Sequence, residues 1–182
     1  MKRFFPFLLV FLMGCTGKDP AMEAALDLRT QCLSAREVCF SADIRADYIT
    51  TLEEFSLECT AGPDGCVAFR VLEPEEISDI RGTVRGSEGT VEFDATVLAF
   101  PLMAQGRLSP LSGPWVVLKA IRSGCILAAG QEGGLIHLTI DDTYEDNALT
   151  VDLWLEDGVP EEAEIAWEGR RVMSMTFDDF SA

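Results

Sequence analysis

The sequence has 182 residues, 48% hydrophobic and 25% charged, so one domain with a sizeable packed core is expected and wholesale disorder is excluded. Lys and Arg together number 14 against 31 Asp and Glu, a formal net charge of -17 at pH 7. A surface this acidic repels phosphate backbones, which argues against a nucleic-acid partner. The single histidine narrows the options for acid–base, nucleophilic and zinc chemistry.

The first residues have the features of a targeting segment. Lys2 and Arg3 supply a short positive start, and residues 4–13 form an uncharged apolar run. About 20 apolar residues are needed to span a bilayer as a helix, so this run is too short to do so. It has the length of the hydrophobic core of a signal peptide.

The apolar run ends in Leu12-Met13-Gly14-Cys15, which resembles the lipobox of bacterial lipoproteins. The resemblance implies a signal peptide at residues 1–14, cleavage after Gly14 and a diacylglyceryl group on the Cys15 thiol. Residues 15–20 would then be a short lipidated tether at the extracytoplasmic face of the cell membrane. An ordinary secretory signal that happens to contain a cysteine is the alternative.

Residues 21–182 are expected to form one β-rich domain. Asp19-Pro20 is typical of a helix start, and the helix is predicted to run to about Ala35. The residues expected to form its mostly apolar stripe are Met22, Ala25, Leu26, Arg29 and Leu33.

After this helix the hydrophobic period changes to two, which is typical of strands. Alternating segments separated by Gly-rich turns predict an antiparallel meander of about ten or eleven strands. A sheet this long is expected to curl into an open half-barrel. The alternating segments are residues 38–48, 55–59, 67–71, 91–97, 136–140, 149–155, 165–167 and 173–177.

The period breaks once, where Ser109-Pro110 and Gly113-Pro114 precede a short helix predicted at residues 115–123. This helix is expected to act as a lid over an open edge or mouth of the sheet. Its predicted apolar face consists of Trp115, Leu118 and Ile121, with Lys119 and Arg122 outside.

This organisation resembles the LolA/LolB-like superfamily, and more closely its uncharacterised lipoproteins of Gram-positive bacteria. The resemblance implies a half-barrel whose apolar concave face can hold acyl chains under a helical lid, without catalysis. No acyl-binding residue of the family matches a specific position in this chain. The stretches that carry the resemblance are residues 41–48 (SADIRADY), 71–77 (VLEPEEI), 108–110 (LSP) and 154–160 (WLEDGVP).

Five cysteines follow Cys15, and none forms a Cys-x-x-Cys pair, which argues against zinc-ribbon and thioredoxin-type sites. A hairpin centred on Ile49 would place Cys39 opposite Cys59, and a disulfide between them is predicted. Cys66 could instead meet Cys59 across the next turn. The pairing of Cys32, Cys66 and Cys125 is left open.

The other candidate sites have simpler explanations. His137 is best interpreted as a strand residue on the less apolar face of its strand. The acidic loop at residues 141–147 lacks EF-hand spacing, so a solvated turn is favoured over a calcium site, and no metal site or cofactor is expected. Trp154 lies off the apolar face of its strand and is either a binding surface or a partly exposed side chain.

The expected function is a membrane-anchored, non-enzymatic lipoprotein that binds an acyl chain or another apolar ligand in the half-barrel. The candidate ligand-binding residues are Trp115, Leu118, Ile121 and Trp154. The alternative is an interaction scaffold for a cell-envelope protein, with the barrel filled by its own side chains. An envelope hydrolase using His137 is the third and least favoured hypothesis.

Overall fold

The computed structural model describes residues 19–48, 50–104, 107–143 and 148–182. Within them, eleven strands form one antiparallel sheet and two further short strands form a hairpin. The strands of the first half are β1 (Val38–Asp47), β2 (Leu52–Ala61), β3 (Val67–Glu73), β4 (Arg81–Arg85), β5 (Glu88–Phe93), β6 (Thr96–Pro101), β7 (Met103–Ala104) and β8 (Arg107–Leu108). Those of the second half are β9 (Cys125–Glu132), β10 (Leu135–Asp141), β11 (Thr150–Glu156), β12 (Val159–Trp167) and β13 (Arg170–Ser181).

The sheet consists of two meanders joined in the middle. The strand order is β6-β5-β4-β3-β2-β1-β13-β12-β11-β10-β9, so β1 pairs with β13 and the two edges are β6 and β9. The predicted open, mainly β architecture of ten or eleven strands is confirmed. Its single meander is corrected to two, because the chain leaves the sheet at one edge and re-enters it at the other.

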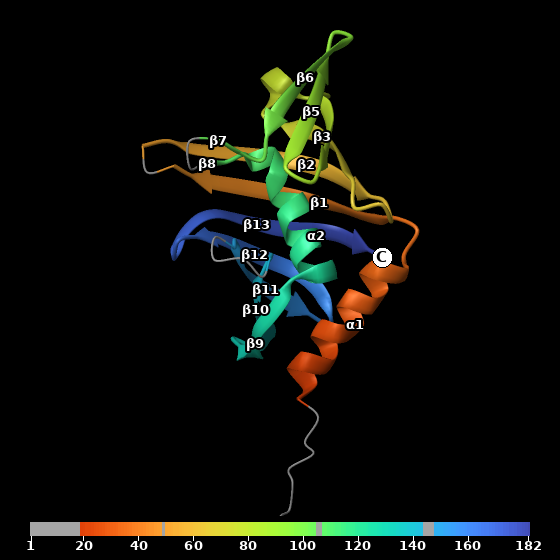
Figure 1. Cartoon of the computed structure of the whole chain (residues 1–182), viewed down its shortest axis with the longest axis vertical. Helices are drawn as coiled ribbons and strands as arrows, with labels where there is room; N and C mark the ends of the chain where they lie inside the picture. Colours follow the sequence, from red (N-terminus) through yellow and green to blue (C-terminus); the bar gives the residue numbers. More distant parts are fainter. Residues whose placement is uncertain (1–18, 49, 105–106, 144–147) are drawn as a thin grey trace, which may run out of the picture.

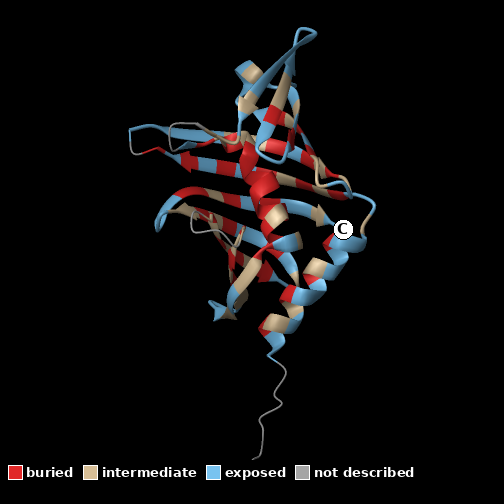
Figure 2. Cartoon of the chain, in the orientation of Figure 1, coloured by how far each residue is buried: buried red, intermediate tan, exposed pale blue. Residues whose placement is uncertain are grey.

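The α2 helix (Gly113–Ser123) makes that crossing from one edge to the other over the concave face (Figure 1). A one-turn 3-10 helix, η2 (Pro110–Ser112), leads into it, and another, η1 (Glu75–Ile77), follows β3. Eight of the eleven α2 residues are buried, and Figure 2 shows this helix as part of the core. The inserted helix therefore fills the centre of the half-barrel.

The N-terminal helix, α1 (Pro20–Ser34), begins as predicted, with the Asp19 carboxylate accepting a hydrogen bond from the Ala21 amide at 3.0 Å. Its predicted apolar stripe is confirmed at Ala25 and wrong at Leu26 and Leu33, which are exposed. The side chains that α1 buries are Ala21, Ala25, Leu28 and Cys32. They recur every three or four residues, as one face of a helix requires.

The segment at residues 91–97 is a hairpin and not one strand. Asp94 and Ala95 both have positive φ, at 47° and 61°, and form the turn between β5 and β6. This turn brings Phe93 opposite Thr96 and Val91 opposite Leu98. Val97 therefore points to the opposite face of the sheet from Phe93 and Leu98.

Candidate functional site

The concave face of the sheet is left uncovered at its β5–β6 end. Four large apolar side chains share this face there, and we call them the apolar strip: Val91, Phe93, Leu98 and Phe100. Phe93 and Leu98 are 59% and 57% exposed, whereas Val91 and Phe100 pack against the core. Apolar surface of this kind on a concave face is a feature of ligand and partner sites.

A glycine in β5 makes room for the aromatic ring of this strip. Gly89 lies opposite Phe100, and a Cβ atom at Gly89 would be 2.1 Å from the ring. The far end of the ring therefore occupies the space that a side chain at Gly89 would need.

The apolar strip runs into a pocket of about 500 Å³, which we call the end pocket. Most of its lining is apolar, and its volume lies within the usual range for small-molecule sites. It is closed on one side by β8 and by the segment that leads into α2. The lining residues are Tyr48, Glu53, Val91, Phe100, Pro101, Arg107, Leu108, Ser109 and Leu111.

Tyr48 joins the apolar and polar parts of the end pocket. Its hydroxyl donates a 2.6 Å hydrogen bond to the carbonyl oxygen of Leu108, and the Arg107 guanidinium lies 5.3 Å from its ring centroid. Burial, with a smaller contribution from the Glu53 carboxylate, raises the pKa of Tyr48 to about 12, and Arg107 acts in the opposite direction. Glu53 and Arg107 therefore both act on the same phenol.

Hydrogen bonds hold α2 firmly in the groove. The Trp115 indole donates to the carbonyl oxygen of Gly65 at 2.9 Å, and the Lys119 ammonium lies 2.8 Å from the buried carboxylate of Asp142. Lys119, predicted to lie outside the apolar face of this helix, is the partner of this buried charge.

Two arginines tie α2 to α1 and to the β2–β3 turn. The Arg29 guanidinium donates to the carbonyl oxygens of Ile121 and Gly124 at 2.7 and 2.8 Å. Arg122 donates to the carbonyl oxygens of Cys32 and Gly62 at 3.1 and 2.9 Å. Arg122 is thus a connector between elements and not an outward-facing residue as predicted.

These contacts place the predicted lid residues in the core. Trp115, Leu118 and Ile121 are 9%, 2% and 2% exposed. Trp115 and Leu118 border a small pocket of about 130 Å³ beside α2, and none of the three lines the end pocket. Sequence reasoning missed Tyr48, Val91, Phe100 and Arg107 as lining residues, because no local pattern brings these distant segments together.

Trp154 lies on the opposite face of the sheet from the apolar strip, in a polar cluster. Its ring stacks on His137 with centroids 4.6 Å apart, and its indole donates to Glu132 at 3.2 Å. His137 Nε2 lies 2.9 Å from Asp152, and its Nδ1 lies 3.3 Å from Glu132. The histidine therefore has two carboxylate partners, which strand periodicity alone did not reveal.

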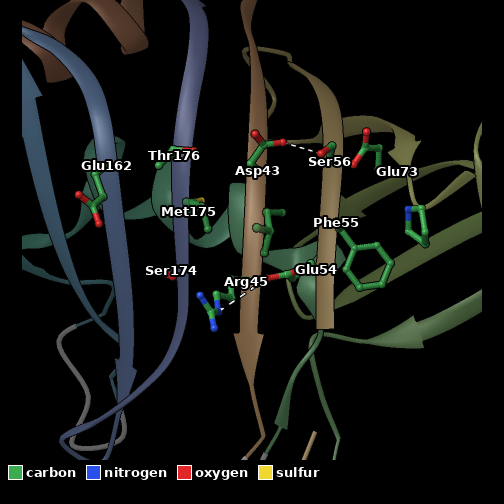
Figure 3. A pocket seen from close by; sticks show the side chains of 12 residues that line it. Asp43, Arg45, Glu54, Phe55, Ser56, Glu73, Glu162, Ser174, Met175 and Thr176 are labelled. Atoms are coloured by element: carbon green, nitrogen blue, oxygen red, sulfur yellow. Dashed lines mark hydrogen bonds and ion pairs between the residues drawn. The ribbon is translucent and has the colours of Figure 1, made fainter. Parts of the chain in front are cut away.

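A second, more polar groove of about 590 Å³ lies on the outer face of β1, β2, β12 and β13 (Figure 3). The Ser56 hydroxyl donates to Asp43, and Arg45 lies 3.8 Å from Glu54. Four carboxylates and one guanidinium give this surface a net negative charge. The acidic residues of its lining are Asp43, Glu54, Glu73 and Glu162.

The predicted Cys39–Cys59 disulfide is wrong. The hairpin register pairs Cys39 with Thr60 and Cys59 with Phe40, one residue away from the predicted register. A shift of one residue places the two side chains on opposite faces, and both thiols are free. Burial raises the pKa of the Cys59 thiol, and Glu58 raises it further.

The predicted signal peptide and the Cys15 lipidation site lie outside the described residues. Among the residues that are described, no helix has the length and apolar character needed to cross a membrane. Within the same part of the chain, no three His, Cys, Asp or Glu side chains come together as a metal site. In the acidic loop, Asp142 is engaged by Lys119 and by the Leu149 amide.

No family model matches the sequence, and no curated protein matches it at the sequence level. Solved structures do match the fold. One is a LolA superfamily protein from Nitrosomonas europaea, with 10% identity, a TM-score of 0.47 and coverage of 88% of this chain and 92% of that chain. The fold is similar to that of LolA superfamily proteins.

Two further matches extend this similarity. An uncharacterised conserved protein from Thermus thermophilus has 12% identity, a TM-score of 0.48 and coverage of 90% and 87% of the two chains. The lipoprotein LppX from Mycobacterium tuberculosis has 12% identity, a TM-score of 0.41 and coverage of 90% and 96%. At these identities the similarity concerns the architecture, and the function has to be argued from the site itself.

Proposed function

We propose that this protein is a lipid-anchored, non-enzymatic lipoprotein of the extracytoplasmic membrane face that binds an acyl chain or another apolar ligand. The observation that carries the proposal is the apolar strip, which α2 leaves exposed and which continues into the end pocket. A ligand that covers exposed apolar side chains removes them from water, and this lowers the free energy of the complex. The ligand site is thus the β5–β6 end of the groove and not the space beneath α2.

The anchor part of the proposal rests on the Leu12-Met13-Gly14-Cys15 motif and on the start of the folded body at Asp19. Three residues separate Cys15 from Asp19, and the two Cα atoms can be at most about 14 Å apart. The body would therefore sit close to the membrane surface. The α1 and β5–β6 ends lie at opposite ends of the molecule (Figure 1), so the ligand site is remote from the anchor.

Neighbouring residues of β6 provide a sharp test. Leu98 belongs to the apolar strip, whereas Val97 faces the other side of the sheet and is 63% exposed. A charge at either position costs little folding free energy, because both side chains are in water. Only Leu98→Asp places a carboxylate where the acyl chain would lie.

The experiment uses the full chain purified in a mild non-ionic detergent, with palmitic acid as the probe and native mass spectrometry as the readout. We expect wild type and Val97→Asp to bind palmitic acid, and Leu98→Asp to bind at least about tenfold more weakly. Equal binding by the two variants, or no binding by wild type, would overturn the proposed site.

The lipid anchor is tested separately, by growing cells with labelled palmitate. The label should enter the wild-type chain and should not enter the Cys15→Ser variant.

A second candidate function, an interaction scaffold, is favoured by the acidic outer groove. Its carboxylates include Asp43 and Glu162 and would attract a basic segment of an envelope protein. Replacing both with the matching amides should lower the association rate of such a segment at low salt. The same double variant should bind palmitic acid as tightly as wild type does, which would show that the two faces act independently.

A further inference from the structure

The end pocket separates polar from apolar lining. Val91, Phe100 and Leu111 form its apolar part, which continues along β5 and β6 as the apolar strip. Glu53 and Arg107 form its charged part: the Arg107 guanidinium lies 5.3 Å from the Tyr48 ring centroid, and the Glu53 carboxylate acts on the pKa of the same phenol. A lining divided in this way suits a ligand that is itself divided into a tail and a polar head.

The two charged side chains are available to a ligand. Among the described residues, neither Glu53 nor Arg107 forms an ion pair with the other or with a third side chain, and the Arg107 contact is with the Tyr48 ring. Glu53 lies opposite Ala46, which is fully buried, so Glu53 is on the groove side of β2. Its neighbour Glu54 lies on the outer face.

The signs of these charges restrict the head group. A head with a negative charge alone would face the Glu53 carboxylate, and a head with a positive charge alone would face Arg107. A head with both charges can pair with each residue, and a guanidinium fits a phosphate particularly well. One cation and one anion beside an apolar strip therefore describe a zwitterionic lipid.

We propose that the ligand is a zwitterionic amphiphile whose phosphate binds Arg107, whose ammonium binds Glu53 and whose acyl chain lies along Val91, Phe93, Leu98 and Phe100. This inference rests on the proposed function and names the class of ligand for the same site.

The test compares three lipids that carry identical acyl chains: phosphatidylethanolamine, phosphatidylglycerol and diacylglycerol. Their heads are zwitterionic, anionic and uncharged. The full chain in mild detergent is titrated with each lipid, and native mass spectrometry gives the bound fraction. We expect phosphatidylethanolamine to bind about tenfold more tightly than either of the others.

The variants Arg107→Gln and Glu53→Gln should each reduce phosphatidylethanolamine binding toward the diacylglycerol level. Glu53→Gln should also improve phosphatidylglycerol binding, because it removes the repelling carboxylate. The matched controls are Arg45→Gln and Glu54→Gln, which change the same residue types on the outer face and should leave all three lipids unaffected.

The outcomes separate the two proposals. Two outcomes for wild type would overturn the proposal of a zwitterionic head group: equal binding of all three lipids, or tightest binding of phosphatidylglycerol. Either outcome would leave the proposed apolar site unaffected. Binding of none of these lipids, and of no palmitic acid, would overturn the proposed function itself. Loss of lipid preference in the control variants would also contradict the assignment.

Discussion

The ammonium group of Lys119 in α2 lies 2.8 Å from the carboxylate of Asp142, which is only 6% exposed at the end of β10. The other oxygen of this carboxylate accepts a 2.7 Å hydrogen bond from the Leu149 amide. A buried carboxylate is tolerated only when its charge and its lone pairs are satisfied. This pair therefore fastens the crossing helix to the β9–β11 half of the sheet.

Replacing Lys119 with methionine should destabilise the protein. The change keeps the side-chain length and leaves the Asp142 charge without a partner, so we expect the free energy of unfolding to fall by about 2 kcal/mol. Urea denaturation measures this loss. Lys119→Arg is the control and should retain most of the stability; a Lys119→Met protein as stable as wild type would show that α2 is not held by this pair.

Gly89→Ala should weaken ligand binding more than it affects folding. The new methyl group would displace the Phe100 ring, whose nearest atom lies 2.1 Å from the Cβ position. We expect a stability loss of about 1 kcal/mol, because the ring is partly buried and can rotate away. Palmitic acid binding should fall severalfold, since Phe100 lines the end pocket.

Gly130→Ala in β9 is the matched control for this change. A Cβ atom at Gly130 meets no other atom within 4 Å, so the substitution should leave both stability and palmitic acid binding unchanged. Equal loss of ligand binding in both variants would contradict the role of the Phe100 ring.

The cysteines should differ in their reaction with a maleimide under native conditions. Cys32 and Cys59 are buried, and burial raises the pKa of Cys32 to about 11, so little reactive thiolate forms at neutral pH. Cys39, Cys66 and Cys125 are partly exposed and should be labelled first. Peptide mapping after timed labelling distinguishes them, and a Cys39–Cys59 cross-link in the oxidised protein would contradict the hairpin register.

Stability should fall in alkaline solution. The pKa of Tyr48 is about 12 in the folded state against an ordinary value of 10, so the unfolded chain loses this proton first. The stabilisation is therefore complete below about pH 10 and is lost as the pH rises toward 12. Urea denaturation between pH 9 and pH 12 measures the slope, to which the buried Cys32 thiol contributes in the same direction.

Tyr48→Phe isolates the tyrosine contribution. It should lower stability at neutral pH by about 1 kcal/mol, because the hydrogen bond to the Leu108 carbonyl oxygen is lost. Its stability should then depend less steeply on pH between 10 and 12 than that of wild type. An unchanged slope would mean that Tyr48 is not the group that titrates.

Hydrophobic periodicity was enough to predict most strands and both helices, because side-chain alternation and capping are local properties. The start of α1 at Asp19-Pro20 is an example. Periodicity was not enough to choose the buried face of α1, since Leu26 and Leu33 satisfy a helical stripe as well as Leu28 and Cys32 do. Which stripe is buried depends on the direction from which α2 and the sheet approach.

The predictions of a Cys39–Cys59 disulfide and of one continuous strand at residues 91–97 were wrong for a related reason. The Cys39–Cys59 prediction depended on the exact centre of a turn, and an error of one residue reverses every side chain of a strand. Residues 91–97 keep an alternating pattern through Asp94 and Ala95, so nothing local distinguished a turn from a continuous strand. The apolar strip exists only because the chain reverses there.

By itself the sequence determined the acidic character of the chain, the lipobox-like start, the mainly β class and the two helices, all of which follow from composition and short-range pattern. Only the tertiary structure decided that β1 joins β13, that α2 has to cross the concave face between the two edges, and that its length leaves the β5–β6 end uncovered. Those are long-range pairings, whose free energy depends on residues far apart in the chain. They move the candidate site from the lid residues to Tyr48, Phe100 and Arg107.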